Sequence, residues 1–216
     1  MGGDDSRDLL EPPPMVLTQA VGNVGEHALG SAALLARFGR DPTEDDVLGP
    51  YYRRGAPYRA KVSPPVSAGR TLHITGKVWG VDISRPIGGA LLDVWQANAD
   101  GHYDNDDPAH PPGRHRYEYR TRLICDEGGA YDFETIYPGP YKMDDRTWRS
   151  PHIHFLVRAL GFKTLVTQLF FAGAEYLDSD PFVKPSLIID LTDINTPSGV
   201  YRHGRFDVVI GSDIDH

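Results

Sequence analysis

Short runs of β-branched and aromatic residues, each followed by a turn signal, constrain the fold of this chain more than any other feature. Eight such runs occur, at residues 71–79, 89–97, 119–125, 130–136, 152–158, 163–171, 186–191 and 206–210. The 18 prolines and 23 glycines suit many short strands and turns better than a helical bundle. The pattern predicts a mainly β fold, an antiparallel β-sandwich.

The 216 residues suffice for one well-buried domain with a small appendage. Residues 1–14, which end in three prolines, are predicted to form a disordered or extended arm. Between residues 15 and 45 the apolar side chains recur at steps of three and four, which predicts a short helical segment. Residues 46–216 then form the sandwich domain.

The composition excludes several classes of partner. A formal charge of −8 makes nucleic acid and anionic membranes improbable partners. The single cysteine, Cys125, excludes an intrachain disulfide framework and suits a reducing compartment. No apolar run approaches the ~20 residues of a membrane span, and the acidic N-terminus has no apolar signal region. We therefore expect a cytoplasmic protein with no membrane contact.

One predicted strand, residues 152–158, carries two histidines two positions apart. Side chains alternate along a strand, so His152 and His154 share one face, with Cα atoms roughly 7 Å apart. Two such imidazoles can bind one metal ion. Upstream, a turn stiffened by two prolines presents Tyr141, and Arg149 supplies a cation between turn and strand. Alone, this pattern is more typical of two half-buried, hydrogen-bonded histidines.

A second stretch, LLDVWQANADGHYDN at residues 91–105, reads as a strand followed by an Asp-Gly turn. Tyr103 follows the turn, where its phenol can face a site at the end of the sheet. The motifs DVWQANADGHY, YPGPY, WRSPHIHF and TLVTQLFF, in that order, jointly resemble the intradiol ring-cleavage dioxygenases. This family includes catechol 1,2-, hydroxyquinol 1,2- and protocatechuate 3,4-dioxygenases. The resemblance covers roughly residues 46–191, beginning near VLGPYYRRGAP.

The resemblance implies one non-haem Fe(III) per chain, held by Tyr103, Tyr141, His152 and His154. It also makes Tyr141 the ligand displaced by substrate and Arg149 the active-site arginine that stabilises charge on the ring. Gln168 matches a glutamine near the iron. The implied reaction opens a catechol between its two hydroxyls with O2, giving a cis,cis-muconate without an external reductant.

The donor chemistry agrees with that ion. Imidazole suits zinc, copper, iron and nickel, but a phenol of pKa near ~10 ionises at neutral pH only beside a strongly polarising cation. Phenolate is a hard anionic donor and favours Fe(III). The two-histidine, one-carboxylate set of Fe(II) oxygenases has no clear candidate in the sequence.

Substrate walls and partners follow from the same resemblance. The apolar lining of catechol-type members corresponds to Val47, Pro50, Ile83, Pro86, Ile87, Phe182 and Val183, all of which could equally be core residues. Met143 stands where protocatechuate-type members tend to have Trp. We therefore expect a neutral catechol as substrate, with O2, in a homodimer. The short N-terminal segment departs from the larger helical domain that carries the family's dimer contact.

Four alternatives remain open from the sequence. A zinc hydrolase could use the two histidines, although no third ligand or general base is recognisable. A sandwich of this size could be a non-catalytic binding module. The acidic segment 100–107 could bind calcium, although it lacks EF-hand spacing. A protocatechuate-type substrate is the alternative within the family.

Overall fold

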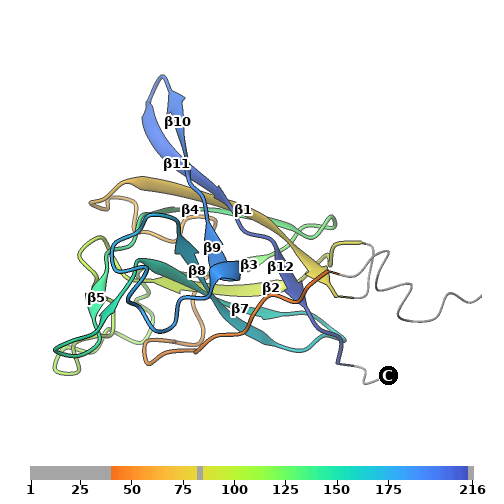
Figure 1. Cartoon of the computed structure of the whole chain (residues 1–216), viewed down its shortest axis with the longest axis horizontal. Coiled ribbons are helices and arrows are strands. Elements are labelled where there is room, and N and C mark those ends of the chain that lie inside the picture. The colour runs from red at the N-terminus through yellow and green to blue at the C-terminus, as the bar shows by residue number, and fades with distance from the viewer. Residues whose placement is uncertain (1–39, 82–84, 214–216) are drawn as a thin grey trace, which may run out of the picture.

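Two β-sheets packed face to face form the body of the protein in the computed structural model, which describes residues 40–81 and 85–213 (Figure 1). The strands are β1 (Thr71–Gly80), β2 (Leu91–Gln96), β3 (Arg120–Ile124), β4 (Ala130–Ile136), β5 (Tyr141–Lys142), β6 (Trp148–Arg149), β7 (His152–Arg158), β8 (Leu165–Phe171), β9 (Ile188–Ile189), β10 (Thr192–Thr196), β11 (Gly199–Arg205) and β12 (Val208–Ile210). One 3-10 helix, η1 (Pro185–Leu187), precedes β9.

The first sheet is built around β1. It pairs antiparallel with β4 along one edge and parallel with β11 and then β12 along the other, and β10 closes the hairpin with β11. The second sheet has the order β3-β2-β7-β8-β9, antiparallel except for β8–β9. The ribbon β5–β6 stands apart from both. The sandwich prediction is confirmed, with three parallel pairs that it did not include.

The core lies between the sheets and follows from strand alternation. Buried and half-buried positions alternate along β1, so that Leu72, Ile74 and Val78 point inward. From the second sheet Ile153 and Phe155 meet them, and both are fully buried. Gln96 makes polar contacts across this core: Thr135 donates to its side-chain oxygen at 2.8 Å, and its side-chain nitrogen donates to the Ile136 carbonyl at 2.9 Å.

The N-terminal segment crosses the edge of the sandwich. The Thr43 amide donates to Val209 of the first sheet at 3.0 Å, and the Asp46 amide to Val166 of the second at 2.8 Å. Residues 40–45 are therefore an extended strap without helix. The predicted arm, residues 1–14, and the rest of the predicted helical segment lie outside the described residues.

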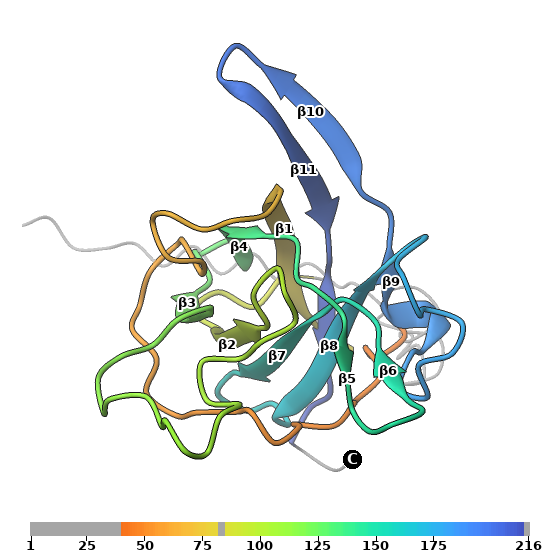
Figure 2. The same cartoon turned by 90° about the vertical axis from the view of Figure 1, so that its left-hand side faces the viewer.

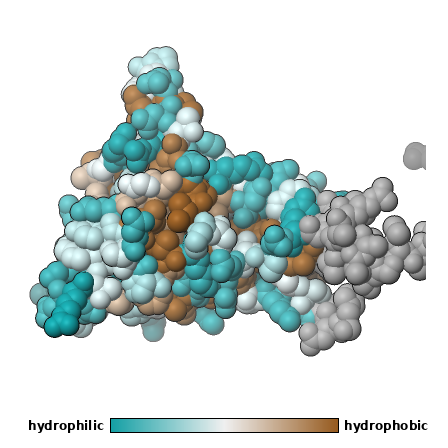
Figure 3. Space-filling model, in the orientation of Figure 1, coloured by the Kyte–Doolittle hydropathy of each residue, from teal (hydrophilic) through white to brown (hydrophobic). Residues whose placement is uncertain are grey.

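Some elements differ from the sequence prediction. β4 and β7 have the predicted bounds, whereas residues 186–191 form the end of η1 and the two-residue β9. β10 and β11 were not predicted, because residues such as Asp193, Asn195 and Arg202 interrupt apolar alternation. Their hairpin projects from the body and carries both hydrophilic and hydrophobic residues (Figures 2 and 3). Within the described part of the chain, no helix is long and apolar enough to span a bilayer.

Candidate metal centre

The two faces of β7 serve different purposes. Ile153, Phe155 and Val157 point into the core with no exposed surface, while His152 and His154 point to the outer face of the second sheet. That outer face is nevertheless covered, and both histidines are at most 3% exposed. The predicted alternation is therefore present, and the site lies outside the sandwich core.

A row of side chains crosses four strands on this outer face. Pairing places Arg120 of β3 opposite Trp95 of β2, Trp95 opposite His154, and His154 opposite Gln168 of β8. The Trp95 ring stacks on the His154 imidazole, with centroids 4.7 Å apart and planes 3° apart. Trp95 thus fixes the plane of one histidine.

Two loops bring the phenols to this row. Tyr103 follows the turn at residues 98–102, and Tyr141 begins the ribbon β5–β6. The loops interlock through glycines: a Cβ on Gly101 would strike the Pro140 carbonyl, and a Cβ on Gly139 the Ala99 carbonyl. The Gly139 amide also donates to the Asn98 carbonyl at 2.8 Å. The close approach needs glycine on both sides and places the two tyrosines side by side.

The four predicted ligands converge on one spot. The Nε2 atoms of His152 and His154 are 3.1 Å apart, and the Tyr103 hydroxyl lies 3.4 Å from the first of them. The Tyr141 ring is 5.7 Å from both the Tyr103 and His152 rings. Two nitrogens bound ~2.1 Å from one ion at about a right angle lie ~3 Å apart. The spacing fits a shared metal ion.

The protonation states also suit a metal. The His152 Nδ1 donates to the Ser150 carbonyl at 2.6 Å, which leaves its Nε2 as a free electron pair. Burial, aided by Arg149, lowers the pKa of His152 to about 3, and burial lowers the pKa of His154 well below its usual value. Both imidazoles are therefore neutral donors at physiological pH.

The phenols need a cation to ionise. Burial raises the pKa of Tyr103 well above its usual value. Burial also raises the pKa of Tyr141, against the opposing charge of Arg149. A bound polarising cation supplies the charge that two phenolates require. The donor set of two neutral imidazoles and two phenols therefore fits a highly charged, hard metal ion.

Arg149 is buried beside this set, and each side of its guanidinium has a partner. Its Nε donates to both oxygens of Asp180 at 3.0 and 3.1 Å, its Nη2 to Gln168 at 2.5 Å, and its Nη1 to the Tyr141 hydroxyl at 3.3 Å. Asp180, which was not predicted, has a fully buried side chain and also accepts from the Ser150 and Phe182 amides. Asp180 therefore orients the guanidinium towards Tyr141.

Further residues of the site were missed by sequence reasoning. Tyr51 stacks on Tyr103 with centroids 4.3 Å apart, and a Cβ added to Gly49 would lie 3.4 Å from the His154 ring. The motif VLGPYYRRGAP contains both, so the signal was present in the sequence. Asp104 and Arg120 form a buried ion pair behind Tyr103 at 2.6 Å. No motif marked Arg120, because its role depends on contacts remote in sequence.

Only some of the residues predicted to line the substrate pocket lie near the candidate site. Val47 and Pro50 are exposed and flank Gly49 over His154, while the Phe182 ring lies 4.4 Å from the Arg149 guanidinium. Val183, in the same segment, packs against the main core. Ile83 lies outside the described residues.

Pro86 and Ile87 are not at the site, which corrects their predicted position. The Ile87 amide donates to Val78, and Pro86 bridges Trp79, at the end of β1 remote from the metal centre. They are separated from Trp95 by the length of β2, about 16 Å. Sequence position alone did not distinguish the two ends of the strand.

The alternative metal sites find little support. No three His, Cys, Asp or Glu side chains come together within residues 40–81 and 85–213 in a way that could hold a metal. In the acidic segment, Asp104 pairs with Arg120, Asp106 with His102 and Asp107 with His110. These carboxylates are committed to other side chains, which disfavours calcium, and zinc lacks a third conventional ligand.

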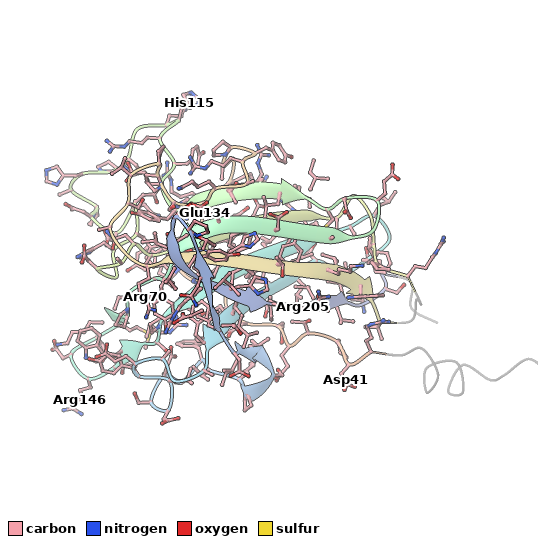
Figure 4. All side chains as sticks on the ribbon, turned by 90° about the horizontal axis from the view of Figure 1, so that it is seen from above. Asp41, Arg70, His115, Glu134, Arg146 and Arg205 are labelled. Atoms are coloured by element: carbon pink, nitrogen blue, oxygen red, sulfur yellow. The ribbon has the colours of Figure 1, made fainter. Side chains whose placement is uncertain are left out.

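A cavity of about 590 Å³ opens beside Tyr141. Its walls include three aromatic rings, three carboxylates and one ammonium group, contributed by Tyr51, Tyr141, Trp148, Asp100, Asp106, Asp107 and Lys142. The turn that follows Lys142 forms a hydrophilic tip, and Arg146 marks its end (Figures 3 and 4). The cavity therefore places an aromatic and net acidic surface beside Tyr141, one of the four predicted ligands.

Comparison with known proteins identifies relatives along most of the chain. A family model described as "Dioxygenase" matches residues 47–212. The 6-chlorohydroxyquinol 1,2-dioxygenase of Cupriavidus pinatubonensis is 36% identical over 185 residues, 78% of this chain and 64% of that protein. The chain thus spans slightly less than two thirds of this relative's length.

Solved structures of dioxygenases share the fold of this chain. The 3-chlorocatechol 1,2-dioxygenase of Rhodococcus opacus 1CP superposes with a TM-score of 0.72 and 29% identity, covering 87% of this chain and 79% of that one. The dioxygenase domain of a carbohydrate-binding fusion protein from Streptomyces sp. SirexAA-E gives 0.67 and 31% identity. That alignment covers 80% of this chain and 99% of the Streptomyces domain.

Proposed function

The chain belongs to the intradiol ring-cleavage dioxygenases, and from this premise we propose that it is a non-haem iron(III) enzyme that cleaves a neutral catechol between its two hydroxyls. O2 is the second substrate, both oxygen atoms enter the product, and the product is a cis,cis-muconate. The observation that carries the proposal is the convergence of two phenols and two neutral imidazoles, at which no third His, Cys, Asp or Glu of residues 40–81 and 85–213 completes a conventional metal site.

Tyr103, Tyr141, His152 and His154 would hold the iron. Bound there, iron(III) would supply the Lewis acidity that activates a catechol ring towards O2. The two phenols, once ionised, match its preference for hard anionic donors, and neutral imidazole is also a common ligand of iron. The buried position, with both histidines at most 3% exposed, limits the access of competing water.

The surrounding residues have separate tasks. Tyr141, the exchanging ligand by family resemblance, can take a proton from an incoming catechol hydroxyl while its oxygen accepts a hydrogen bond from Arg149. The fixed charge of Arg149 stabilises negative charge that develops on the ring. Gln168 and Asp180 hold the guanidinium in place.

Metal analysis and visible spectroscopy test the metal assignment. The purified protein should contain about one iron per chain, and tyrosinate-to-iron(III) charge transfer should make it red-brown to burgundy. Incubation with catechol under air should give a product heavier by two oxygen atoms, identified by mass. Stoichiometric zinc with no visible band would overturn the proposal.

The charges near the site favour a neutral ring. The cavity beside Tyr141 carries more carboxylates than ammonium groups. Of the arginines in residues 53–59, Arg53 pairs with Asp104, Arg59 donates to backbone carbonyls, and Arg54 is exposed. A carboxylate on the substrate would therefore meet a surplus of negative charge and be costly to bury.

A substrate panel tests this preference. We expect catechol, methylcatechol or hydroxyquinol to have a higher kcat/KM than protocatechuate under identical conditions. A protocatechuate advantage of more than about tenfold, or ~1.4 kcal/mol, would show that a cationic subsite exists. The homodimer and the cytoplasmic location stay predictions, which sedimentation analysis and cell fractionation can test.

A further inference from the structure

Arg120 is a buried cation that contacts both the loop after Tyr103 and the segment that contains Tyr51. Its side chain is 2% exposed and lies in the row with Trp95, His154 and Gln168. Its guanidinium donates from Nε to Asp104 at 2.6 Å, from Nη2 to Asn105 at 2.6 Å and from Nη1 to the Tyr51 carbonyl at 2.5 Å. One planar group thus binds the segment that follows Tyr103 and the segment that covers it.

Asp104 is the matching anion. Its side chain is 4% exposed, and it receives hydrogen bonds from Arg120, from Arg53 at 2.6 Å and from the Glu118 amide at 3.2 Å. These donors come from β3, from the segment after the strap, and from the far end of the loop. Asp104 therefore joins three stretches of chain directly next to Tyr103.

The Tyr103 ring is confined as a result. It is 4% exposed and stacks on Tyr51, whose carbonyl Arg120 holds. Its amide donates to Asp106 at 3.1 Å. Contacts therefore hold the Tyr103 ring and the Tyr103 backbone, and Arg120 holds the Tyr51 residue on which the ring stacks.

Tyr141 is held in a different way. It belongs to a two-residue strand, is less buried than Tyr103, and is followed by the exposed Lys142 and Met143. Its hydroxyl accepts a hydrogen bond from Arg149, which is also the residue paired with Tyr141 in the two-stranded ribbon, and that ribbon belongs to neither of the two main sheets. The two phenols therefore differ in how firmly the fold restrains them.

We propose that the Arg120–Asp104 ion pair is a positioning device that keeps Tyr103 in place as the retained phenol donor and so confines ligand exchange to Tyr141. This inference rests on the proposed function. Removing two charges from water is expensive, and a buried ion pair often stabilises a fold no better than apolar residues of similar volume. The ion pair lies directly next to Tyr103. Groups that support a metal ligand set the orientation of that ligand and the affinity of the site for the metal.

Two conservative variants test the device. Arg120→Lys keeps the charge but loses the planar fork that reaches three acceptors. Asp104→Asn keeps the shape and removes the charge, and serves if the first variant fails to fold. The matched control is Arg158→Lys, because Arg158 pairs with buried Asp93 on the same face at the other end of β7.

Each protein is loaded with iron(III) and, separately, with redox-inert gallium(III), and the bound tyrosinates are counted from ultraviolet difference spectra. Wild type and Arg158→Lys should show two tyrosinates and the same visible band. Arg120→Lys and Asp104→Asn should bind iron at least about tenfold more weakly and lose or shift the Tyr103 contribution. Anaerobic catechol should abolish tyrosinate absorption in them and only reduce it in wild type.

Spectra and iron affinities of Arg120→Lys and Asp104→Asn that match wild type would overturn the positioning role while leaving the proposed function intact. Equal spectral losses in Arg158→Lys would also overturn it, because a general loss of stability would then explain the effect. A wild-type protein that shows no tyrosinate with either ion would remove the proposed function and this inference together.

Discussion

At the scale of the residue, a different kind of contact holds each of the four candidate metal donors in its orientation. His152 is oriented by a carbonyl, His154 by a stacked indole, Tyr103 by a stacked phenol and Tyr141 by a guanidinium. Each donor has its own partner, so a substitution at one ligand should leave the others in position. The effects of single substitutions on metal binding can then be assigned to single donors.

His152→Ala and His154→Ala should each bind iron at least about tenfold more weakly than wild type, measured as iron per chain after dialysis. No His, Cys, Asp or Glu among the described residues stands ready to replace them. His73→Ala is the control, because His73 lies on the first sheet beside Asp132. Unchanged iron content in both site variants would exclude these imidazoles as ligands.

Asp180→Asn should keep iron and colour but lower kcat about 10- to 100-fold. The substitution removes the anion that aims Arg149 at Tyr141, and small misplacements at a reacting centre cost rates of this size. Asp178→Asn is the control two residues away. Wild-type kcat in Asp180→Asn, with the fold intact by circular dichroism, would show that Gln168 alone orients Arg149.

At the scale of the element, the two interlocked loops decide whether the phenols meet. Gly101 has φ +84° and lies against Pro140, while Gly139 lies against Ala99. Neither approach leaves room for a Cβ, and backbone atoms on the other side cannot move aside cheaply. The register between these loops therefore sets the geometry of the candidate metal centre.

Gly139→Ala should destabilise the protein by about 2 kcal/mol or more and lower its iron content, because the new methyl group displaces the Tyr103 loop. Urea unfolding and metal analysis measure the two effects. Gly113→Ala lies in the long loop that follows Tyr103 with open space around it, and should change neither. Equal stability of the two variants would contradict the interlock.

Local patterns predicted much of this arrangement, and remote contacts explain what they missed. Alternation along residues 152–158 placed His152 and His154 on one face, because strand geometry depends only on neighbours. Asp180 could not be recognised, since its partner Arg149 is 31 residues away. Ile87 was misplaced for the same reason: an apolar residue before a strand shows no sign of which end holds the site.

At the scale of the whole molecule, the metal-free protein buries two neutral imidazoles. Unfolding returns them to water, where a histidine has its ordinary pKa of 6.5, whereas His152 has a pKa of about 3 in the fold. Below pH 6.5 the unfolded chain therefore binds protons that the folded chain does not. Folded stability then rises with pH in this window and falls as pH is lowered.

The metal-free protein should lose up to about 1.4 kcal/mol of unfolding free energy per pH unit through His152 as the pH falls from ~6.5 to ~3, and His154 should act in the same direction. Urea unfolding at a series of pH values measures the slope. The double variant His152→Gln and His154→Gln should have a shallower slope, since these titrating groups are gone. If the unfolding free energies of the two proteins depended equally on pH, these histidines would not be the cause of the pH dependence.

The separation of the two faces of β7 has an evolutionary consequence. Substitutions at Ile153, Phe155 and Val157 would affect folding, whereas substitutions on the opposite face would affect the candidate site. Mutations that retune the cavity beside Tyr141 can therefore accumulate without disturbing the core. A scaffold of this kind can diversify its substrates by drift in its loops, and relatives only 29–36% identical to this chain carry names that differ in their ring substituents.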